Sequence, residues 1–540
     1  MKSTLLVVLV TVSLQYIIAD EREWLNWGNG IDNNRYSKSN DIKVSNAHTL
    51  TLLWSKNLTG DVSATPTIVK IGHKQYVFFP DWMGYVYALD AYTGFQYWKA
   101  NISSYTGITT APIGGIAYAN GIYNSTSRNS PAYGRVGNKH LLVLGDQASG
   151  KFMALNALDG SLEWIKVLDT HPTAVITMSP TIHDGYIYVG VSSTESGYVA
   201  VNATYPCCSF AGSFYKLNLL TGNTIWKWNA IHPSLRQGPP SEQYSGCALW
   251  GSSPSLDPVL GLVFTGTGQN YNYPTAVKEC IRQSRLNGSN ELLCLDPRNY
   301  FDSFIALSMA DGSLVWFKKL NNQTDYFNAA CVFGAPACPP LDIRGNDWDL
   351  PQAPMLYTRK GKKFAAAGAK SGIFWSLKPS DGSLRWWANT GPGGTGGGVM
   401  WGSATDGKTI FTSNTNSLRR TYTMKNGQNT TLGIWSAINA YNGQFKWQIT
   451  DPTGTATPRS GHSGAPMTLT KKGVLFMGAE GRLYALDSSN GNILWTYNVT
   501  GTVMSGPAVV KDRVYWGTGY GRYFGLGGNS GKVFYAFKLP

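Results

Sequence analysis

The sequence predicts an all-β protein folded as an eight-bladed β-propeller, and three observations carry this prediction. A hairpin pattern recurs seven times in the 540 residues, a motif of a small residue next to Pro precedes each copy, and the composition favours turns between short strands. Gly supplies 61 residues, and only 14% of the chain is charged, against roughly 25% in typical soluble domains. Coiled coils and helical bundles need more charged helix formers. The 43% of hydrophobic residues excludes general disorder.

Each hairpin copy consists of an apolar strand, a turn containing Gly, and a Trp four residues after that Gly. In the first copy Ala88-Leu89-Asp90 ends the strand, Gly94 lies in the turn and Trp98 follows. Asp or Asn opens such a turn, and Gly takes the position with positive φ. The other pairs are Gly160/Trp164, Gly222/Trp226, Gly312/Trp316, Gly382/Trp386, Gly443/Trp447 and Gly491/Trp495. A docking side chain at a fixed spacing is expected where repeated units stack on a common core.

The small-residue–Pro motif indicates the start of another strand in each unit, because Pro is tolerated at the first residue of a strand. It occurs eight times, and the sixth copy, Ser403-Ala404, lacks the Pro. Eight units allow roughly 65 residues each, enough for four short strands and long loops. The last unit lacks its final strand, and Thr51-Leu52-Leu53-Trp54 supplies one. We therefore expect residues 20–540 to form a single propeller domain whose N-terminal strand closes the ring.

Residues 1–19 have the features of a signal peptide. Lys2 provides the positive charge, an apolar run follows, and Ile17 and Ala19 suit cleavage before Asp20. The alternative, a membrane anchor, is disfavoured because the apolar run is short. The sequence thus predicts a secreted protein, or a periplasmic one in a bacterium, without a membrane span.

The seven cysteines fit an oxidising compartment. The pairs Cys280/Cys294 and Cys331/Cys338 are expected disulfides, the neighbours Cys207-Cys208 can form a third, and Cys247 is left over. No cysteine belongs to a haem-attachment or zinc motif. The net charge of +14 comes from scattered basic residues, which disfavours nucleic-acid binding and permits attraction to anionic glycans. Eight sequons permit N-glycosylation: Asn57, Asn101, Asn124, Asn202, Asn287, Asn322, Asn429 and Asn498.

The intact hairpin of residues 88–98 resembles the repeat of quinoprotein alcohol dehydrogenases, propellers that bind pyrroloquinoline quinone (PQQ) and Ca²⁺ on the ring axis. The opening Trp24-Leu25-Asn26-Trp27-Gly28 is similar to the start of that family. The resemblance is strongest to the polyvinyl-alcohol-dehydrogenase-like branch, and it rests on residues 60–66, 205–208 and 294–303. It covers nearly the whole chain and implies oxidation of alcohol groups.

The resemblance also implies a set of site residues. Trp250 matches the Trp beneath the quinone, Thr177 a quinone-contacting Thr, and Lys370 the basic residue that contacts the quinone oxygens. Glu195 matches a calcium ligand. Gln269 stands where a second ligand is normally Asn, so either Gln269 binds the ion, or Asn270 substitutes, or calcium binding is weakened.

Two further positions depart from the family. The catalytic Asp, which takes the alcohol proton, is matched by Asp296 or Asp302, and Asp296 is slightly favoured. The segment Asp347-Trp348-Asp349 is expected only to shape the pocket. The adjacent cysteines that cap the quinone in the family have no counterpart in residues 104–115, and Cys207-Cys208 lies elsewhere as a possible structural clip.

These observations favour a secreted quinoprotein-like oxidoreductase with PQQ and Ca²⁺ that oxidises a small or polymeric alcohol. Because the chain has no haem motif, its electrons would pass to an external acceptor. The departures keep two alternatives open: a non-catalytic extracellular propeller that binds proteins or glycans, and an enzyme of the same fold with another cofactor or none.

Overall fold

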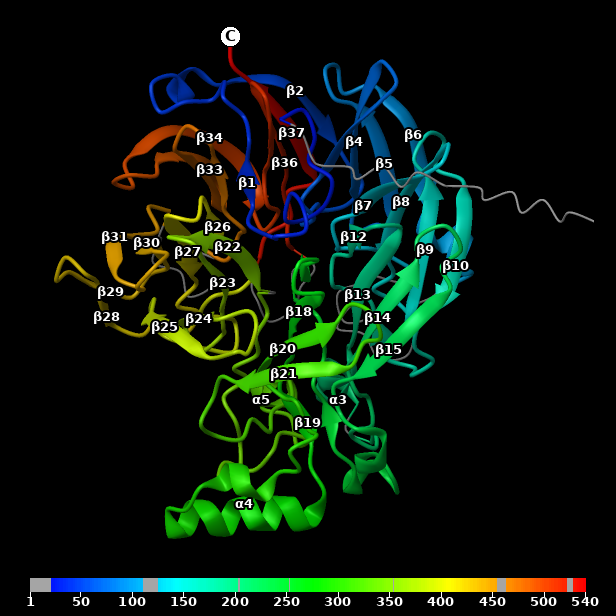
Figure 1. Cartoon of the computed structure of the whole chain (residues 1–540), viewed down its shortest axis with the longest axis vertical. Helices are drawn as coiled ribbons and strands as arrows, with labels where there is room; N and C mark the ends of the chain where they lie inside the picture. Colours follow the sequence, from blue (N-terminus) through cyan, green and yellow to red (C-terminus); the bar gives the residue numbers. More distant parts are fainter. Residues whose placement is uncertain are drawn as a thin grey trace, which may run out of the picture.

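The computed structural model describes residues 21–109, 125–202, 204–251, 253–352, 354–453, 463–521 and 528–540. The predicted signal peptide and the sequon at Asn124 lie outside these residues. Eight sheets follow one another around a central axis in chain order, and the last sheet in sequence meets the first (Figure 1). This confirms the predicted eight-bladed β-propeller.

The first four sheets are antiparallel and have the same strand order. They are β3 (Thr67–Ile71), β4 (Lys74–Pro80), β5 (Tyr85–Asp90) and β6 (Gln96–Asn101); β7 (Ala132–Val136), β8 (Lys139–Gly145), β9 (Lys151–Asn156) and β10 (Leu162–Val167); β12 (Thr181–His183), β13 (Tyr186–Ser193), β14 (Ser213–Asn218) and β15 (Thr224–Asn229), with β11 (Ala174–Val175) added to β13; and β17 (Ser255–Asp257), β18 (Leu262–Gly266), β20 (Ser303–Ser308) and β21 (Leu314–Lys319).

The other four sheets include the strands that close the ring. They are β22 (Met355–Arg359), β23 (Lys362–Gly368), β24 (Ile373–Leu377) and β25 (Leu384–Asn389); β26 (Ala404–Thr405), β27 (Thr409–Asn414), β30 (Ile434–Asn439) and β31 (Phe445–Thr450); β1 (Tyr36–Ser37), β32 (Thr468–Thr470), β33 (Val474–Asp487) and β34 (Ile493–Thr502); and β35 (Ala508–Val510), β36 (Arg513–Gly517), β37 (Val533–Lys538) and β2 (Thr51–Asn57).

The predicted docking role of the repeated Trp residues is confirmed. The rings of Trp54 and of the first six repeat Trp residues each lie against the turn Gly of the next sheet: a Cβ on Gly312 would lie 2.6 Å from the ring of Trp226, and one on Gly94 would lie 2.8 Å from that of Trp54. The indole N–H then donates to a backbone carbonyl of the same turn, as Trp226 does to Met309 at 3.2 Å. Only Gly fits there, since the position combines positive φ with this close approach.

The ring is closed by the N-terminal strand that contains Trp54, as predicted. Strand β2 pairs antiparallel with β37, which completes the eighth sheet, and Trp54 donates to the Ala91 carbonyl of the first sheet at 3.1 Å. The closing joint on the other side uses Trp495, whose indole donates to the Leu50 carbonyl at 3.0 Å. The N-terminal segment is therefore part of the ring's packing.

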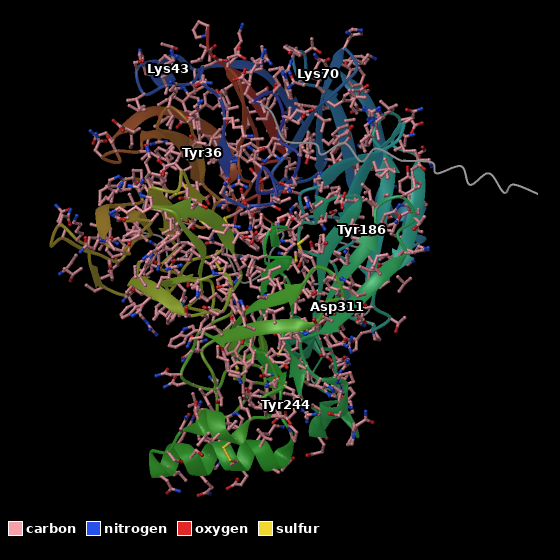
Figure 2. The ribbon with its side chains drawn as sticks, viewed as in Figure 1. Tyr36, Lys43, Lys70, Tyr186, Tyr244 and Asp311 are labelled. Carbon is pink, nitrogen blue, oxygen red and sulfur yellow. A yellow bond between two sulfur atoms is a disulfide. The ribbon has the colours of Figure 1, made fainter. Side chains whose placement is uncertain are left out.

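Loops of the third and fourth sheets build an extension on one side of the ring (Figure 1). It contains α3 (Glu195–Val201), α4 (Thr275–Asn287), α5 (Ala330–Phe333), η2 (Pro233–Leu235), η3 (Pro240–Glu242), η4 (Glu291–Cys294) and the strand pair β16 (Ser245–Gly246) and β19 (Asn270–Asn272). Figure 2 places Tyr244 in this extension, between the ring and α4. The remaining short elements are α1 (Ile102–Thr106), η1 (Ala47–Thr49), β28 (Tyr422–Thr423) and β29 (Asn429–Thr430).

The extension also holds the three disulfides, which agree with the predicted pairings. Cys280 on α4 is bonded to Cys294, Cys331 on α5 to Cys338, and Cys207 to Cys208, while Cys247 is a buried free thiol. Within the described parts of the chain, no helix is long and apolar enough to cross a membrane.

Candidate functional site

A cavity of about 170 Å³ lies on the ring axis and is lined by loops of six consecutive sheets. The contributing residues come from just before or just after inner strands: Trp82, Arg128, Thr177, Trp250, Gln269, Lys370 and Trp401. Three of the predicted cofactor-binding residues, Trp250, Lys370 and Thr177, are therefore brought to one cavity although they are far apart in sequence.

Lys370 is the central charge of this cavity. Its Nζ lies 2.9 Å from Asp347 Oδ2 and 2.9 Å from Asp349 Oδ2, and all three side chains are at most 8% exposed. Burial alone lowers the pKa of Lys370, but the two carboxylates outweigh burial and raise it above its usual value. The side chain is consequently a permanent cation, held in place by two salt bridges.

Trp250 provides a flat surface beside that cation. The Lys370 Nζ lies 5.1 Å from the centre of the indole ring, and the indole N–H donates to Asp349 Oδ2 at 3.0 Å. Trp401 meets the ring edge-on, with centroids 5.5 Å apart, and Thr177 Oγ1 donates to the Trp250 carbonyl at 3.2 Å. Lys370, Asp349 and Trp401 thus fix the indole in the cavity wall, and an indole held in this way suits stacking of a flat aromatic ligand.

The two carboxylates beside Lys370 differ in what they can still accept. Asp349 is fully engaged, since its Oδ1 also accepts the backbone N–H of Gln269 at 2.8 Å. Asp347 Oδ1 is buried and has no hydrogen-bond partner among the described residues. Burial raises the pKa of Asp347 to about 8, against the opposing effect of Lys370. Asp347 therefore lines the cavity and carries the one unengaged carboxylate oxygen of this triad.

The segment that carries Asp347 and Asp349 is fixed from behind by Asp325. The backbone N–H groups of Asp347 and Trp348 donate to the two carboxylate oxygens of Asp325 at 2.9 and 2.6 Å. Asp302 is buried beside Asp325 and accepts from Asn321 Nδ2 at 2.8 Å. Burial, reinforced by the charge of Asp325, raises the pKa of Asp302 well above its usual value.

Neither predicted catalytic Asp lines the cavity. Asp302 belongs to the layer behind it, and Asp296 forms an ion pair with Arg298 at 2.8 Å, with 23% of its side chain exposed. The carboxylates that line the cavity are Asp347 and Asp349, which the sequence suggested only as residues that shape the pocket. The sequence feature that points to these two residues is the Asp347-Trp348-Asp349 segment after the fourth hairpin.

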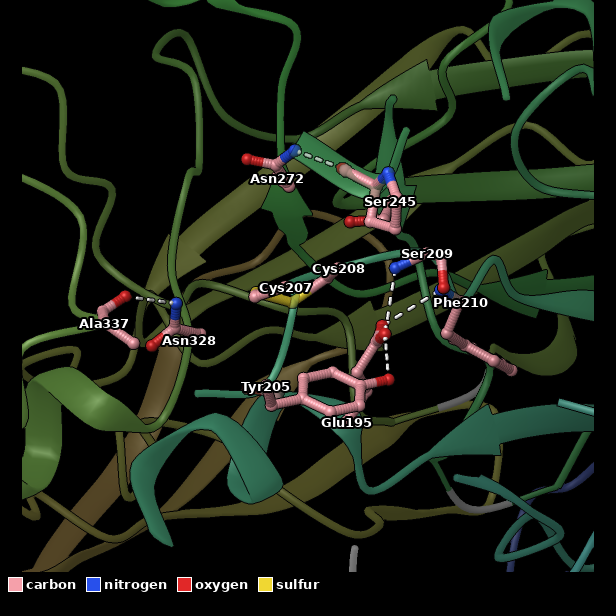
Figure 3. The surroundings of a disulfide bond; sticks show 12 residues. Glu195, Tyr205, Cys207, Cys208, Ser209, Phe210, Ser245, Asn272, Asn328 and Ala337 are labelled. Atoms are coloured by element: carbon pink, nitrogen blue, oxygen red, sulfur yellow. Dashed lines mark hydrogen bonds between the residues drawn. A yellow bond between two sulfur atoms is a disulfide. The ribbon is translucent and has the colours of Figure 1, made fainter. Parts of the chain in front are cut away.

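Glu195, a predicted calcium ligand, is fully buried and does not line the cavity. Figure 3 shows its carboxylate turned toward the loop of Cys207 and Cys208. Its Oε1 accepts the hydroxyl of Tyr205 and the N–H of Ser209, both at 2.8 Å, and its Oε2 accepts the N–H of Phe210 at 2.9 Å. In this position Glu195 stabilises its own loop.

The other two predicted ligands are divided between the cavity and the interior. Gln269 lines the cavity, whereas Asn270 exchanges amide hydrogen bonds with Asn299 at 2.9 and 3.0 Å and is completely buried. Among the residues that the structure describes, no three His, Cys, Asp or Glu side chains are arranged to hold a metal ion. Calcium prefers six to eight oxygen ligands, so the donor set around the cavity does not fit that ion.

Two features of the cavity were not found from the sequence. Arg128 lies in its wall with its guanidinium 5.6 Å from the ring centre of Trp401, and it follows a long segment that matches no repeat. Val332 and Phe333 of α5 form an apolar part of the wall while 47% and 37% exposed. The disulfide Cys331–Cys338 and the loop around α5 are an insertion between repeats, where periodicity gives no information.

Comparisons with known proteins agree with the repeat. The family model described as glucose/ethanol/alcohol dehydrogenase, beta-propeller domain, matches residues 24–326, and that of outer membrane protein assembly factor BamB matches residues 431–539. Polyvinylalcohol dehydrogenases of Pseudomonas sp and Sphingopyxis sp. (strain 113P3) are both 26% identical over 96% of this chain, covering 77% and 76% of their own lengths.

Solved structures show the same fold. Quinohemoprotein alcohol dehydrogenase ADHIIG of Pseudomonas putida HK5 superimposes with a TM-score of 0.68 at 16% identity, over 96% of this chain and 80% of that one. A europium-containing methanol dehydrogenase gives 0.65 at 16% identity, over 96% and 98%. Since the family model spans more than half of the chain and the ring has the matching number of blades, this protein belongs to the PQQ-dependent alcohol dehydrogenase family of β-propellers.

Proposed function

We propose that this chain is a quinoprotein oxidoreductase that oxidises alcohols in the axial cavity. One observation carries the proposal: a buried, permanently charged Lys370 lies beside the face of Trp250 and next to an unengaged carboxylate oxygen of Asp347. A flat support, a fixed cation and a proton acceptor are the protein groups that quinone-dependent alcohol oxidation requires.

The cavity residues fit PQQ, a flat molecule with several carboxylates. Trp250 would support the ring system, Thr177 would lie at its edge, and Lys370 and Arg128 would face its anionic oxygens. When bound, PQQ supplies a quinone that accepts hydride from the alcohol carbon. Calcium is not part of this proposal, because the donor set does not fit it.

Asp347 is the residue we propose as the proton acceptor. Above about pH 8, where its carboxyl is ionised, its Oδ1 would accept the hydroxyl proton of the alcohol, while Oδ2 stays paired with Lys370. Asp325 keeps the backbone of Asp347 in position through its hydrogen bond. The earlier candidates Asp296 and Asp302 remain sequence predictions, and their positions away from the cavity favour Asp347 over both.

The substrate we propose is an uncharged alcohol with an apolar portion. The charged groups lie around Lys370, whereas Val175, Phe327, Val332 and Phe333 contribute apolar wall, part of it exposed at α5. Such a wall favours an alkyl or polymeric alcohol over a sugar or a charged substrate. The polyvinylalcohol dehydrogenases among the relatives are named for a substrate of this kind.

We also propose that the protein acts outside the cell, or in the periplasm of a bacterium. The three disulfides support an oxidising compartment. The sequence has no haem-attachment motif, so the electrons would be passed to an external acceptor.

A direct test measures PQQ binding by quenching of tryptophan fluorescence, followed by reduction of an artificial dye with a series of alcohols. We expect binding at micromolar PQQ, and oxidation of primary or secondary alcohols. Lys370→Gln should weaken both, whereas Lys378→Gln, a matched change at an exposed Lys of the same sheet, should alter neither. Absence of PQQ binding at this concentration would contradict the proposal.

The second candidate function, a non-catalytic extracellular propeller that binds proteins or glycans, is favoured by one observation: Glu195, the predicted calcium ligand, is engaged by its own loop. The same titration separates the two functions. A non-catalytic propeller would bind no PQQ and would not reduce the dye with any alcohol.

A further inference from the structure

The axial site already contains a cation that belongs to the chain. We propose that Lys370 is the only cation the site needs besides Arg128, and that PQQ binds and reacts there without a calcium ion. This inference rests on the proposed function for the identity of the cofactor, but its metal-binding part concerns the protein alone.

Both carboxylate oxygens of Glu195 are engaged by its own loop. Three hydrogen bonds, from Tyr205, Ser209 and Phe210, are donated to its two oxygens, and His171 Nε2 lies 3.6 Å from Oε1. A calcium ligand at this position would have to give up hydrogen bonds that close its own loop. Glu195 is completely buried, and it does not line the cavity.

The side-chain amides near the site offer few oxygens to a metal ion. The Asn270 Oδ1 accepts from Asn299 Nδ2 at 2.9 Å, and its Nδ2 donates to Ser245 O and Asn299 Oδ1, each at 3.0 Å. Its carbonyl oxygen therefore faces Asn299 rather than the cavity. Gln269 lines the cavity and remains as a single amide ligand, which is far from the six to eight oxygens that calcium takes.

The charges of the cavity also disfavour a divalent ion. The two cavity carboxylates share Lys370, and Asp349 accepts two further hydrogen bonds, from the Trp250 indole and the Gln269 backbone. Only Oδ1 of Asp347 is unengaged. A divalent ion bound by these carboxylates would either lie beside a buried ammonium group of like charge or displace it, and both are unfavourable.

The experiment measures metal binding by the cofactor-free full chain. Tb³⁺ replaces calcium, and its emission is recorded on excitation of tryptophan, because Trp250 lies beside the carboxylates. We expect no saturable emission from the wild-type protein at Tb³⁺ concentrations up to about 100 μM. Calcium-sensor proteins bind their ion with dissociation constants of about 10 μM or below, so this range would reveal a comparable site.

A reciprocal variant sharpens the test. In the wild type, Lys370 pairs with one oxygen each of Asp347 and Asp349, and Lys370→Ala frees both oxygens. This variant should therefore gain a Tb³⁺ site at least about tenfold tighter than any in the wild type. Lys378→Ala, at an exposed Lys paired with Asp381 on the same sheet, is the matched control and should gain none. If Lys370→Ala does not fold, the wild-type titration still decides, because it needs no variant.

The cofactor is tested separately, by measuring the Kd of PQQ with excess EDTA and with millimolar Ca²⁺. We expect the two values to agree within about twofold, and metal analysis of the complex to find no stoichiometric calcium. A saturable wild-type Tb³⁺ site abolished by Glu195→Gln would overturn the inference, as would PQQ binding that requires Ca²⁺. If PQQ binds under neither condition, the proposed function fails, while the Tb³⁺ titration still decides whether the chain has a metal site.

Discussion

The outer and axial parts of this propeller are built by opposite principles. At the outer edge, one contact is repeated at seven of the eight joints between sheets: a Trp ring against a turn Gly, with an indole hydrogen bond to the same turn, as in the pairs Trp98/Gly160 and Trp316/Gly382. On the axis, the six contributing sheets supply different residues at equivalent places.

This difference shows where stability and chemistry are separated in the molecule. The outer contacts have the same structural task in neighbouring sheets, so they are nearly identical. Together they hold the ring. The ring surrounds the axial residues, so a charge such as Lys370 is buried with its two partners. The repeats thus provide the frame, and the departures from the repeat provide the site.

The largest effect is expected on the axis, from Lys370→Met. Removing the ammonium leaves Asp347 and Asp349 buried without their partner, which should cost about 3–5 kcal/mol of unfolding free energy. Alcohol oxidation should fall by at least about 100-fold. Urea unfolding and dye reduction measure the two effects. The control Lys378→Met removes an exposed pair with Asp381, and a loss below about 1 kcal/mol is expected; equal losses would contradict the assigned burial.

The next effect tests the outer contact. Gly312→Ala places a Cβ at positive φ and 2.6 Å from the Trp226 ring, so the unfolding free energy should fall by about 2–4 kcal/mol. Gly361 has a similar φ of +71 but no atom within 4 Å of the added Cβ. Gly361→Ala should therefore cost only the backbone term of about 1 kcal/mol. Thermal or urea unfolding measures the loss of stability in both variants. Equal losses would contradict a contribution of the Trp226 contact.

A smaller effect concerns pH, and it compares a buried carboxyl with an exposed one. Burial raises the pKa of Asp302, so the folded protein keeps a proton that the unfolded chain releases above about pH 4. The stability from this group is present below that pH and is lost as the pH rises through the folded-state pKa. Asp302→Asn should reduce the decline in stability between pH 4 and 8, as measured by urea midpoints.

Asp311, in an exposed hairpin turn, should show the opposite sign. Hydrogen bonds from Ser313 lower its pKa to about 2, so its contribution is present above the unfolded pKa and is lost as the pH falls. Asp311→Asn should therefore flatten the acid side of the curve only. A decline toward neutral pH that is unchanged in Asp302→Asn would show that another group causes it.

The smallest effect is expected at the cavity wall of α5. Phe333→Ser should raise the KM for alkyl alcohols about tenfold, leave the KM for short polar alcohols unchanged, and alter stability by less than about 0.5 kcal/mol. Leu341→Ser, at a residue that is 80% exposed and does not line the cavity, is the matched control. A KM increase of the same size for all alcohols would argue against an apolar substrate contact.

The outer frame of the propeller is more predictable from the sequence than its axis, for physical reasons. The Gly–Trp spacing encodes a local turn and a contact with the next unit, so seven pairs and the role of Trp54 follow from the chain itself. Trp250 and Lys370 were predicted because their local sequences match the family's motifs. Asp347 and Arg128 were given no such roles, because the long loops that precede them follow no periodicity. The partners of Glu195 come from an irregular loop too, and local sequence cannot show which way a carboxylate turns.

The closing sheet has a consequence for how the protein is made. Strand β2 pairs with β37, so the eighth sheet combines segments from opposite ends of the propeller sequence. Contacts between such distant segments form slowly, since a long loop must be ordered first. During synthesis β2 is made early, and its backbone hydrogen-bonding groups stay unpaired until β37 is available. Closure of the ring is therefore expected only once β37 is available, and the interval before closure is the period in which this chain is most exposed to aggregation.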